Sequence, residues 1–472
     1  MAERDGAASN AENAILLGGE PLGEPVSPER PTARPVNRAA RITSVDCVRG
    51  FAVLGILLMN IVGMGMYGAA YVDPTVAGGA TGVNFWIWAV MHVLVDGKMR
   101  CLFSMIFGAS TILLTSRLES RRDAADIYYR RIIWLLLFGI LHAYLLWWGD
   151  ILYTYALCAF ILYPFRNNPS KRLLIIGGSL VLVNVLVYIG GGFAQREIIQ
   201  NGRADQHAID QGKKLTDEQQ QEFTEYQQWR RAFQPTPEQL KHDAEQWRGN
   251  PLQVIKQRAT IVFAFFHEAP YYAPDNLDAW SMMFIGMALM KLGVLSAARS
   301  RKFYLVLLAI GYGIGVPINC YTTWVIVRNG FDPVVSTFTN SAYDVGRLLV
   351  AAGHLSLVIL IIQARWLTGL MRVLGAVGQM ALTNYVLQSL ITAFVFSGYG
   401  FRLYGRVERY QLYYVVAGIW VFEMIASPIW LRHFQFGPLE WVWRSLTYWR
   451  RQPLRILTST GAPAHAIVAS SA

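Results

Sequence analysis

Long apolar runs constrain this chain more than any other feature of its sequence. A helix of about 20 apolar residues crosses the roughly 30 Å of hydrocarbon in a bilayer, and the sequence holds about ten apolar runs. They lie at 48–67, 86–116, 131–148, 151–165, 172–194, 276–296, 303–325, 345–364, 374–397 and 411–431. Only 15% of the residues are charged, against about 25% in a typical soluble protein. The sequence therefore predicts an all-α, polytopic membrane protein with about ten transmembrane helices.

Composition divides the chain into five parts. Residues 195–275 are charged and rich in Gln, and the stretch "PTPEQL" places a proline where a helix starts. The first residues lack the basic start and apolar core of a secretory signal. We expect a disordered cytoplasmic tail at 1–43, a first transmembrane bundle of about five spans at 44–194, an extracytoplasmic helical insert at 195–275, a second bundle of about five spans at 276–432, and a cytoplasmic interfacial helix and tail at 433–472.

Lys and Arg in the short loops predict the orientation of the chain. The loops at 117–131, 166–172, 297–302 and 364–372 are basic and fall on one side of the ten-span count. The positive-inside rule places these loops and both termini in the cytoplasm. The loop at 401–410 disagrees, because it carries three arginines on the predicted outside. Basic loops and anionic lipid account for the net charge of +11, so no nucleic-acid partner is expected.

Polar residues inside the apolar runs are the candidates for function, because an ionisable group at membrane depth costs at least a few kcal/mol. At the start of the first run, Asp46 and Arg49 are spaced i, i+3 and can pair. Asn60 follows Arg49 by eleven residues, which places it on nearly the same helix face and about 16 Å deeper. A plain ion pair and an interhelical hydrogen bond would explain these residues without any function.

The second run is interrupted by a cluster of ionisable residues. His92, Asp96, Lys98 and Arg100 lie close together, and the i, i+4 spacing of His92 and Asp96 lets the carboxylate orient the imidazole. Gly97 would allow the backbone to break there. The run is therefore either an interfacial segment followed by a span or a broken helix. Snorkelling and mutual ion pairing are the alternative to a functional role.

Later runs add more buried polar groups. The third run carries His142, and Asp150 follows two turns beyond. The eighth run contains Arg347 and His354, and the ninth carries a polar stripe that includes Asn384. Each of these side chains can also be a hydrogen-bonded structural group.

The depths of these groups predict a polar cavity that is open to the outside. Glu423 stands in the middle of the last run with no cation nearby in sequence. Most of the groups fall in the outer half of the membrane: Asp96, Lys98, Arg100, His142, Asp150, Asp344, Arg347 and His354. An imidazole with a carboxylate can supply a general base, and arginine at the inner entrance can hold the phosphates of a cytoplasmic donor. The sequence shows no GxSxG, HExxH, P-loop or dinucleotide motif in a fitting context, and we expect no bound metal.

Several stretches together resemble one family. They are "VDCVRGFAVLGILLMNI", "MRCLFSMIFGAS", "LLLFGILHAYLLWWGDILYTYAL", "GQMALTNYVLQS" and "FGPLEWVWRSLTY", and they are similar to the YeiB-like bacterial inner-membrane proteins, which share a domain of unknown function. The resemblance covers residues from about 41 to 450 without the insert. It implies a multi-pass protein of the bacterial cytoplasmic membrane and leaves its activity open.

The first span also resembles two distant relatives, the lysosomal heparan-glucosaminide N-acetyltransferase and the bacterial membrane acyltransferases that modify surface sugars. These enzymes move an acyl group from cytoplasmic coenzyme A to an extracytoplasmic acceptor. The acyltransferases carry an arginine followed at a fixed spacing by a catalytic histidine. Here Arg49 is followed at that spacing by Asn60, as in the heparan-type enzyme. The resemblance implies that Arg49 and Asn60 belong to the donor site and leaves the base open between His142 and His92.

Two functions from different classes follow. An acyltransferase would use acyl-CoA as co-substrate, no bound cofactor, and a small-molecule or glycan acceptor. Its catalytic residues would be His142, His92, Asp96 and Asp150, and its binding residues Asp46, Arg49, Asn60, Lys98, Arg100, Arg347, His354 and Asn384. A secondary transporter would use the same buried His, Asp and Arg for substrate or protons. A scaffold would leave the buried charges unexplained. The lipid bilayer is an expected partner, and no oligomeric state is predicted.

Overall fold

The computed structural model describes residues 42–77, 79–267 and 269–456. Side chains are described throughout these ranges except at 265, 267 and 269–275. The tail predicted at 1–43 lies outside the described residues except for its last two, and the end of the chain from 457 lies outside them too.

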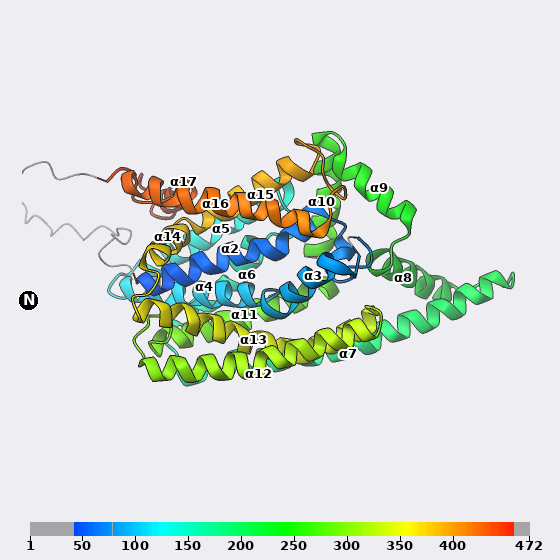
Figure 1. Ribbon diagram of the computed structural model, residues 1–472, viewed down its shortest axis with the longest axis horizontal. Coiled ribbons are helices and arrows are strands. Elements are labelled where there is room, and N and C mark those ends of the chain that lie inside the picture. The colour runs from blue at the N-terminus through cyan, green and yellow to red at the C-terminus, as the bar shows by residue number, and fades with distance from the viewer. Residues whose placement is uncertain (1–41, 78, 268, 457–472) are drawn as a thin grey trace, which may run out of the picture. The chain divides into compact units, whose positions relative to one another are not determined.

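The described chain is helical and contains no strand, apart from an isolated β-bridge between Phe434 and Arg455. This confirms the predicted all-α class. Figure 1 shows the helices side by side in a bundle. In chain order they are α2 (Thr43–Gly65), α3 (Gly82–Leu94), α4 (Lys98–Arg117), α5 (Ala124–Leu145), α6 (Leu152–Leu162), α7 (Ser170–Asp210), α8 (Asp217–Phe233), α9 (Pro237–Arg248), α10 (Pro251–His267), α11 (Ala269–Lys291), α12 (Arg301–Arg328), α13 (Pro333–Gln363), α14 (Thr368–Gln379), α15 (Ala381–Phe396), α16 (Arg409–His433) and α17 (Pro438–Thr447).

Six helical stretches of the described chain are long and apolar enough to cross a membrane: α2, the α3–α4 pair, α7, α12, α13 and α16. These helices support a membrane protein, whereas the predicted count of about ten spans is not confirmed. Some of the other predicted spans are short or divided. α6 has 11 residues and continues directly into a 3₁₀ helix at Tyr163–Asn167. The ninth predicted span is divided at Met380 into α14 and α15.

The second predicted span is divided into two helices, and both alternatives that the sequence left open include such a break. α3 ends at Leu94 and α4 begins at Lys98. Between them Gly97 has a φ of +67°. Glycine adopts this left-handed conformation readily, whereas any other residue loses about 1–2 kcal/mol there. The break therefore occurs at the glycine that the sequence singles out.

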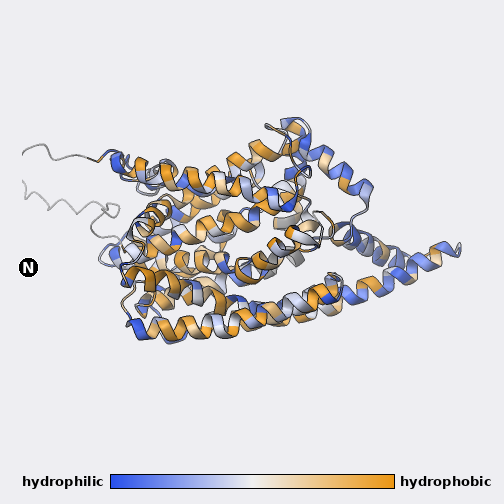
Figure 2. Cartoon of the chain, in the orientation of Figure 1, coloured by the Kyte–Doolittle hydropathy of each residue, from blue (hydrophilic) through white to orange (hydrophobic). Residues whose placement is uncertain are grey.

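The polar insert begins as an extension of a membrane helix. α7 has 41 residues and passes position 194, where the first bundle was predicted to end, without interruption. Its second half packs against an aromatic face of α8 that contains Tyr226 and Trp229. Capping boxes at Thr216 and Thr236 start α8 and α9 by satisfying their first backbone N–H groups. Figure 2 shows the change from apolar to hydrophilic residues along α7 and into α8 and α9.

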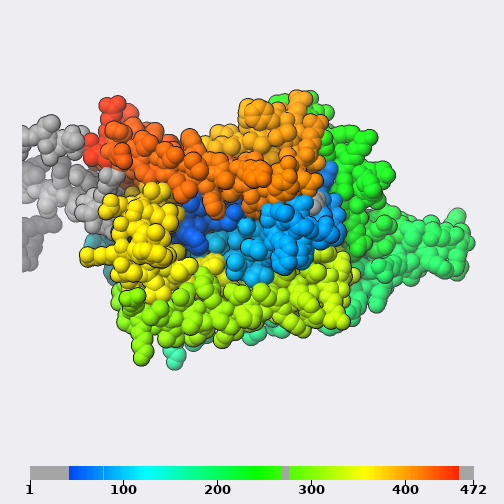
Figure 3. Space-filling model, viewed as in Figure 1, coloured from blue at the N-terminus to red at the C-terminus, as the bar shows by residue number. Residues whose placement is uncertain are grey.

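α2 is the central helix of the bundle. Most of its residues are buried, and Figure 3 shows only a narrow strip of it between α14, α16 and α3. One hydrophobic core joins α2 and α4 to α11, α13 and α14. Residues from both predicted bundles therefore pack around the same helix.

Basic loops meet at the end of the bundle where α2 begins, which we call the basic end. The Lys291 ammonium donates to Asn168 O at 2.8 Å, and the Gln363 amide donates to Arg299 O at 3.0 Å. α17 reaches the same end through a hydrogen bond from Trp443 to the start of α5. We call the opposite end, which carries α8 and α9, the insert end.

The arginine-containing loop at 401–410, which disagrees with the orientation rule, serves partly as a structural link. Arg409 is 2% exposed, and its guanidinium donates to Ala70 O at 2.6 Å. A buried arginine that holds a neighbouring loop contributes to packing as well as to the charge of its membrane side.

Candidate functional site

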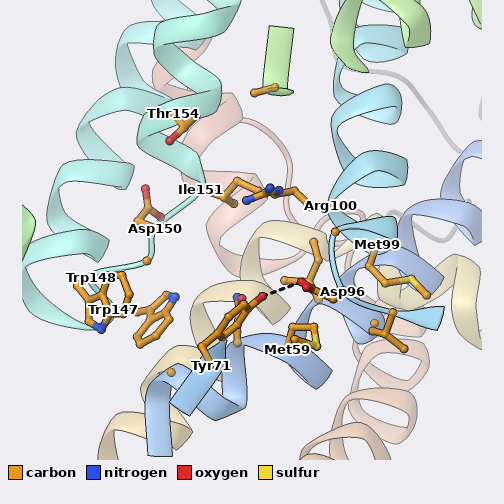
Figure 4. Close-up of a pocket in the computed structure, with 18 of the residues that line it drawn as sticks. Met59, Tyr71, Asp96, Met99, Arg100, Trp147, Trp148, Asp150, Ile151 and Thr154 are labelled. Carbon is orange, nitrogen blue, oxygen red and sulfur yellow. Dashed lines mark hydrogen bonds between the residues drawn. The ribbon is translucent and has the colours of Figure 1, made fainter. Parts of the chain in front are cut away.

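A cavity of about 280 Å³ lies inside the bundle, on the half of α2 nearer the insert end. Its wall comes from α2, the α3–α4 break, the turn between α5 and α6, and α11. It brings together four residues singled out from the sequence: Asn60, Asp96, Arg100 and Asp150. Figure 4 shows the Arg100 side chain extending from α4 toward Ile151 and Asp150 on the opposite wall.

Aromatic side chains complete much of this wall. Tyr71, Trp147, Trp148 and Tyr155 all line the cavity. Its volume is close to the lower end of the range of about 300–1,000 Å³ that is typical of ligand pockets. A mostly apolar wall with a few converging polar groups is the usual construction of a small-molecule site.

His142 and Asp150 form a buried pair at the edge of the cavity. His142 Nδ1 lies 2.7 Å from Asp150 Oδ1, and the two side chains are 2% and 0% exposed. α5 ends at Leu145, and the turn that follows brings Asp150 back beside it. The other carboxylate oxygen of Asp150 accepts a hydrogen bond from the Tyr153 backbone N–H at 2.6 Å, at the start of α6. The carboxylate is therefore fixed by the first turn of the next helix.

This pair has the arrangement of a general base. Asp150 lines the cavity, and His142 stands directly behind it. Both ring nitrogens of His142 are buried without a hydrogen-bond partner among the described residues, so Nδ1 and Asp150 Oδ1 are close but do not have hydrogen-bond geometry. An imidazole with a carboxylate beside one nitrogen and the other nitrogen unoccupied can accept a proton, because the carboxylate stabilises the imidazolium that forms.

His92 and Asp96 are also adjacent, at a greater distance. His92 Nδ1 lies 3.6 Å from Asp96 Oδ2, and the imidazole is stacked on Trp88 and on Tyr343 with centroid distances of 5.3 and 4.7 Å. The Tyr71 hydroxyl donates to Asp96 Oδ1 at 2.9 Å (Figure 4). Asp96 faces the cavity, whereas His92 lies between aromatic rings away from it.

Lys98 holds the broken helix together. Its side chain is completely buried. The ammonium donates to His92 O at 2.6 Å and to the Tyr343 hydroxyl at 2.8 Å. Lys98 thus binds the last turn of α3, and it does not line the cavity.

An ion network lies beside the cavity. Asp278 accepts two hydrogen bonds from Arg347, at 3.1 and 2.6 Å, and Arg100 Nε lies 3.2 Å from the same carboxylate. Arg347 also contacts Asp344 at 2.9 Å, and Asp344 accepts a hydrogen bond from Asn184 at 2.7 Å. Two guanidiniums and two carboxylates make the network neutral, which limits the cost of burying it. It joins α4, α7, α11 and α13.

Three further candidates lie at other places in the bundle. Arg49 and Asp46 form the ion pair expected from their spacing, at 2.8 Å, near the basic end. His354 uses both ring nitrogens, one 2.7 Å from the Tyr312 hydroxyl and the other 2.8 Å from Leu94 O. These contacts tie α13 to α12 and α3, so they give His354 a structural role.

Asn384 belongs to a separate polar cluster between α15 and α16. Its amide donates to Val377 O and to Ser427 Oγ, both at 3.1 Å. One turn further along α15, Gln388 donates to Glu423 at 3.0 Å. Glu423 is fully buried and does not line the cavity.

Sequence reasoning missed three contributors to the site. Asp278 is the shared ion-pair partner of Arg100 and Arg347. It lies at the start of a predicted span, and a carboxylate in that position could have marked it as a candidate. The Tyr385 ring lies 4.9 Å from the His142 ring, and nothing in the sequence points to that contact. Asn184 could have been found as an amide in the middle of an apolar run.

No group of three or more His, Cys, Asp or Glu side chains within the described residues has the arrangement needed to hold a metal ion.

Comparison with known proteins gives a family and no activity. The family described as "Protein of unknown function (DUF418)" matches residues 289–450. The uncharacterized protein YeiB of Escherichia coli (strain K12) is 30% identical over 416 residues, which cover 86% of this chain and 96% of YeiB. The uncharacterized protein YxaH of Bacillus subtilis (strain 168) is 28% identical over 435 residues, with 88% and 96% covered. An uncharacterized 39.9 kDa protein of Bacillus acidopullulyticus is 25% identical over 421 residues, with 89% and 97% covered. No solved structure matches the chain.

Proposed function

The chain belongs to the YeiB-like DUF418 family, and from the site described above we propose that it is a membrane acyltransferase. It moves an acyl group from cytoplasmic acyl-CoA to an acceptor on the other side of the bacterial inner membrane. The observation that carries the proposal is the buried His142–Asp150 pair, 2.7 Å apart, at the edge of a cavity inside the bundle.

The chemistry requires one base and one path for a proton. His142 Nε2 takes the proton from an acceptor hydroxyl or amine as its oxygen or nitrogen attacks the thioester carbonyl. The carbon–sulfur bond then breaks, the new ester or amide remains on the acceptor, and the proton passes from the imidazolium to the CoA thiolate. Asp150 stabilises the imidazolium between these two steps.

Arg49 supports binding of the donor from the cytoplasmic side. It lies near the basic end, where its side chain is 22% exposed, and a guanidinium binds phosphate well. Along α2 the cavity wall begins at Gly55, about 9 Å from Arg49 along the helix axis. The part of acyl-CoA that carries the acyl group has to reach the cavity along the stretch of α2 between Arg49 and Gly55, and this path is part of the proposal.

The proposed orientation places the basic end in the cytoplasm and the insert end outside, in keeping with the positive-inside rule. Both termini are then cytoplasmic, and the cavity lies in the outer half of the membrane. The acceptor is a small molecule or glycan. It must carry a hydroxyl or an amine, because that group is the nucleophile of the reaction.

Transport is the second candidate, and the broken helix favours it. Secondary transporters bind their substrates at interrupted helices near the middle of the membrane. Here the break at Gly97 lies in the cavity wall, and Arg100 on the first turn of α4 faces the same space.

One experiment separates the two candidates. The purified protein in liposomes is given acetyl-CoA with a radiolabelled acetyl group, together with monosaccharides, glycerol and ethanolamine as acceptors. We expect CoA release and label transfer to an acceptor. His142→Gln should lower the rate about 10²–10⁴-fold, the usual contribution of a general base, whereas His207→Gln, on the polar part of α7, should leave it unchanged.

The donor site and the alternative are tested with the same preparation. Arg49→Gln should raise the KM for acetyl-CoA about tenfold or more, because it removes a charged hydrogen bond to phosphate. If His142→Gln releases CoA as fast as the unchanged protein, the acyltransferase proposal is wrong. Saturable uptake of an acceptor into the liposomes without CoA release would support transport instead.

A further inference from the structure

Trp147 places a buried N–H group at the cavity wall, in the same turn that carries the His142–Asp150 pair. The Trp147 backbone N–H donates to His142 O at 3.0 Å, so the last turn of α5 holds the two residues close together. The indole is 7% exposed. Its Nε1 has no hydrogen-bond acceptor among the described residues, although the side chain lines the cavity. A buried donor without an acceptor costs about 1–3 kcal/mol.

Two glycines fix the indole plane. A methyl group at Gly63 on α2 or at Gly149 in the α5–α6 turn would be too close to the Trp147 ring. The ring therefore packs closely against the backbones of both glycines. The indole N–H is held in place by packing, which is the condition for a preorganised donor.

The charges around the cavity already balance. Outside the His142–Asp150 pair, Arg100 and Asp96 line the cavity, and the adjoining buried groups add Lys98, Arg347, Asp278 and Asp344, which makes three cations and three carboxylates. A ligand with a full negative charge would upset this balance. A neutral carbonyl oxygen, which takes up charge only during a reaction, would not. The unused donor therefore suits a carbonyl better than a carboxylate or a phosphate.

We propose that the Trp147 indole N–H and the Arg100 guanidinium bind the carbonyl oxygen of the acyl group and stabilise the negative charge that develops on it. This proposal rests on the acyltransferase function proposed above and assigns it an oxyanion site. When the acceptor attacks the carbonyl carbon, the carbonyl π electrons move to that oxygen, next to the indole N–H. They return when the carbon–sulfur bond breaks and the CoA thiolate leaves.

The assignment explains the order of groups in the segment from His142 to Asp150. The base, the oxyanion donor and the carboxylate that supports the base all belong to nine consecutive residues, in one turn between two helices. Arg100 approaches from the opposite wall (Figure 4). A carbonyl between Trp147 and Arg100 would have donors at its oxygen, with the base behind Asp150 at the edge of the same cavity.

The test uses acetonyl-CoA, a thioether in which a methyl ketone replaces the acetyl thioester, with ¹³C at the ketone carbonyl. The protein is measured in liposomes by isotope-edited infrared spectroscopy. Binding should lower the carbonyl stretching frequency. Trp147→Phe keeps the ring and removes the N–H, so it should abolish most of this shift and lower kcat for CoA release about 10²–10³-fold with little change in KM.

Controls and outcomes separate this proposal from the one on which it rests. Trp324→Phe, on the exposed face of α12, should preserve both the shift and kcat. Gly63→Ala, which displaces the ring, should reduce the shift as Trp147→Phe does. If acetonyl-CoA binds without a shift, or Trp147→Phe keeps both the shift and kcat, the oxyanion site is wrong while the acyltransferase proposal stands. If acetonyl-CoA does not bind at all, both proposals fail.

Discussion

The buried ion network around Asp278 makes the strongest prediction about stability. Asp278→Asn keeps the size of the side chain and removes its charge. Asp278 is 3% exposed, is bonded twice to Arg347 and contacts Arg100 at 3.2 Å. The substitution leaves two guanidiniums with only Asp344 to balance them. Removal of one partner from a buried pair costs about 3–5 kcal/mol, so we expect the free energy of unfolding to fall by that amount.

The measurement is reversible unfolding in mixed SDS and dodecylmaltoside micelles, followed by tryptophan fluorescence. Asp126→Asn is the matched control, because Asp126 pairs with Arg130 at 3.5 Å and its side chain is 74% exposed. That change should cost less than about 1 kcal/mol. Adding Arg100→Gln to Asp278→Asn restores the charge balance and should recover part of the loss. The reasoning is refuted if Asp278→Asn costs no more than Asp126→Asn, or if the double variant is less stable than Asp278→Asn.

Three further predictions concern other parts of the fold. Glu440→Ala removes the carboxylate that accepts a hydrogen bond from the Leu382 N–H, at 2.7 Å, at the start of α15. We expect the free energy of unfolding to fall by about 2 kcal/mol and hydrogen exchange in that turn to become faster. Unchanged exchange would contradict the capping role. Gly97→Ala forces a left-handed alanine whose methyl group would also be too close to the Arg347 side chain, so it should lower the unfolding free energy by at least about 1–2 kcal/mol in the same micelle assay. A neutral result would mean that the break does not need a glycine. Burial raises the pKa of Asp243 in α9, against hydrogen bonds from Tyr404 and others. Because the folded state then holds the proton more tightly than the unfolded state, the insert should lose stability as pH rises above about 4, the ordinary pKa of an aspartate. Exchange of α9 in Asp243→Asn should lack this trend, and a stability that rises with pH would reverse the argument.

Local features of the structure could be predicted from the sequence because they depend on spacing along one helix. The ion pair of Asp46 and Arg49 follows from i, i+3 geometry. The break at Gly97 follows from a glycine among charges. The helices of the insert follow from their caps, which need only four consecutive residues.

Contacts between helices could not be predicted in the same way. Arg347 contacts Asp278 from a position 69 residues away in sequence, and only the packing of α11 and α13 against the same two helices, α4 and α7, brings them together. The sequence predicts one polar cavity for most of the buried polar groups, yet His354, which belongs to that prediction, is bonded elsewhere, and the candidate binding residue Asn384 lies in a separate cluster. Hydropathy predicts one span at 151–165, whereas the structure divides this stretch between α6 and a 3₁₀ helix, a change of helix type that composition does not reveal.

Accessibility of the cavity is the most direct test of the account. In a variant whose four native cysteines are replaced, Asn60→Cys places a thiol in the cavity wall, and Ser356→Cys places one in the packed interior of α13. Intact vesicles are treated with a small charged methanethiosulfonate reagent, and labelling is followed by mass spectrometry. We predict that Asn60→Cys reacts when the reagent is on the insert side and that Ser356→Cys does not react. If Asn60→Cys is as inert as Ser356→Cys from both sides, the cavity is closed to polar molecules and cannot be a site of reaction.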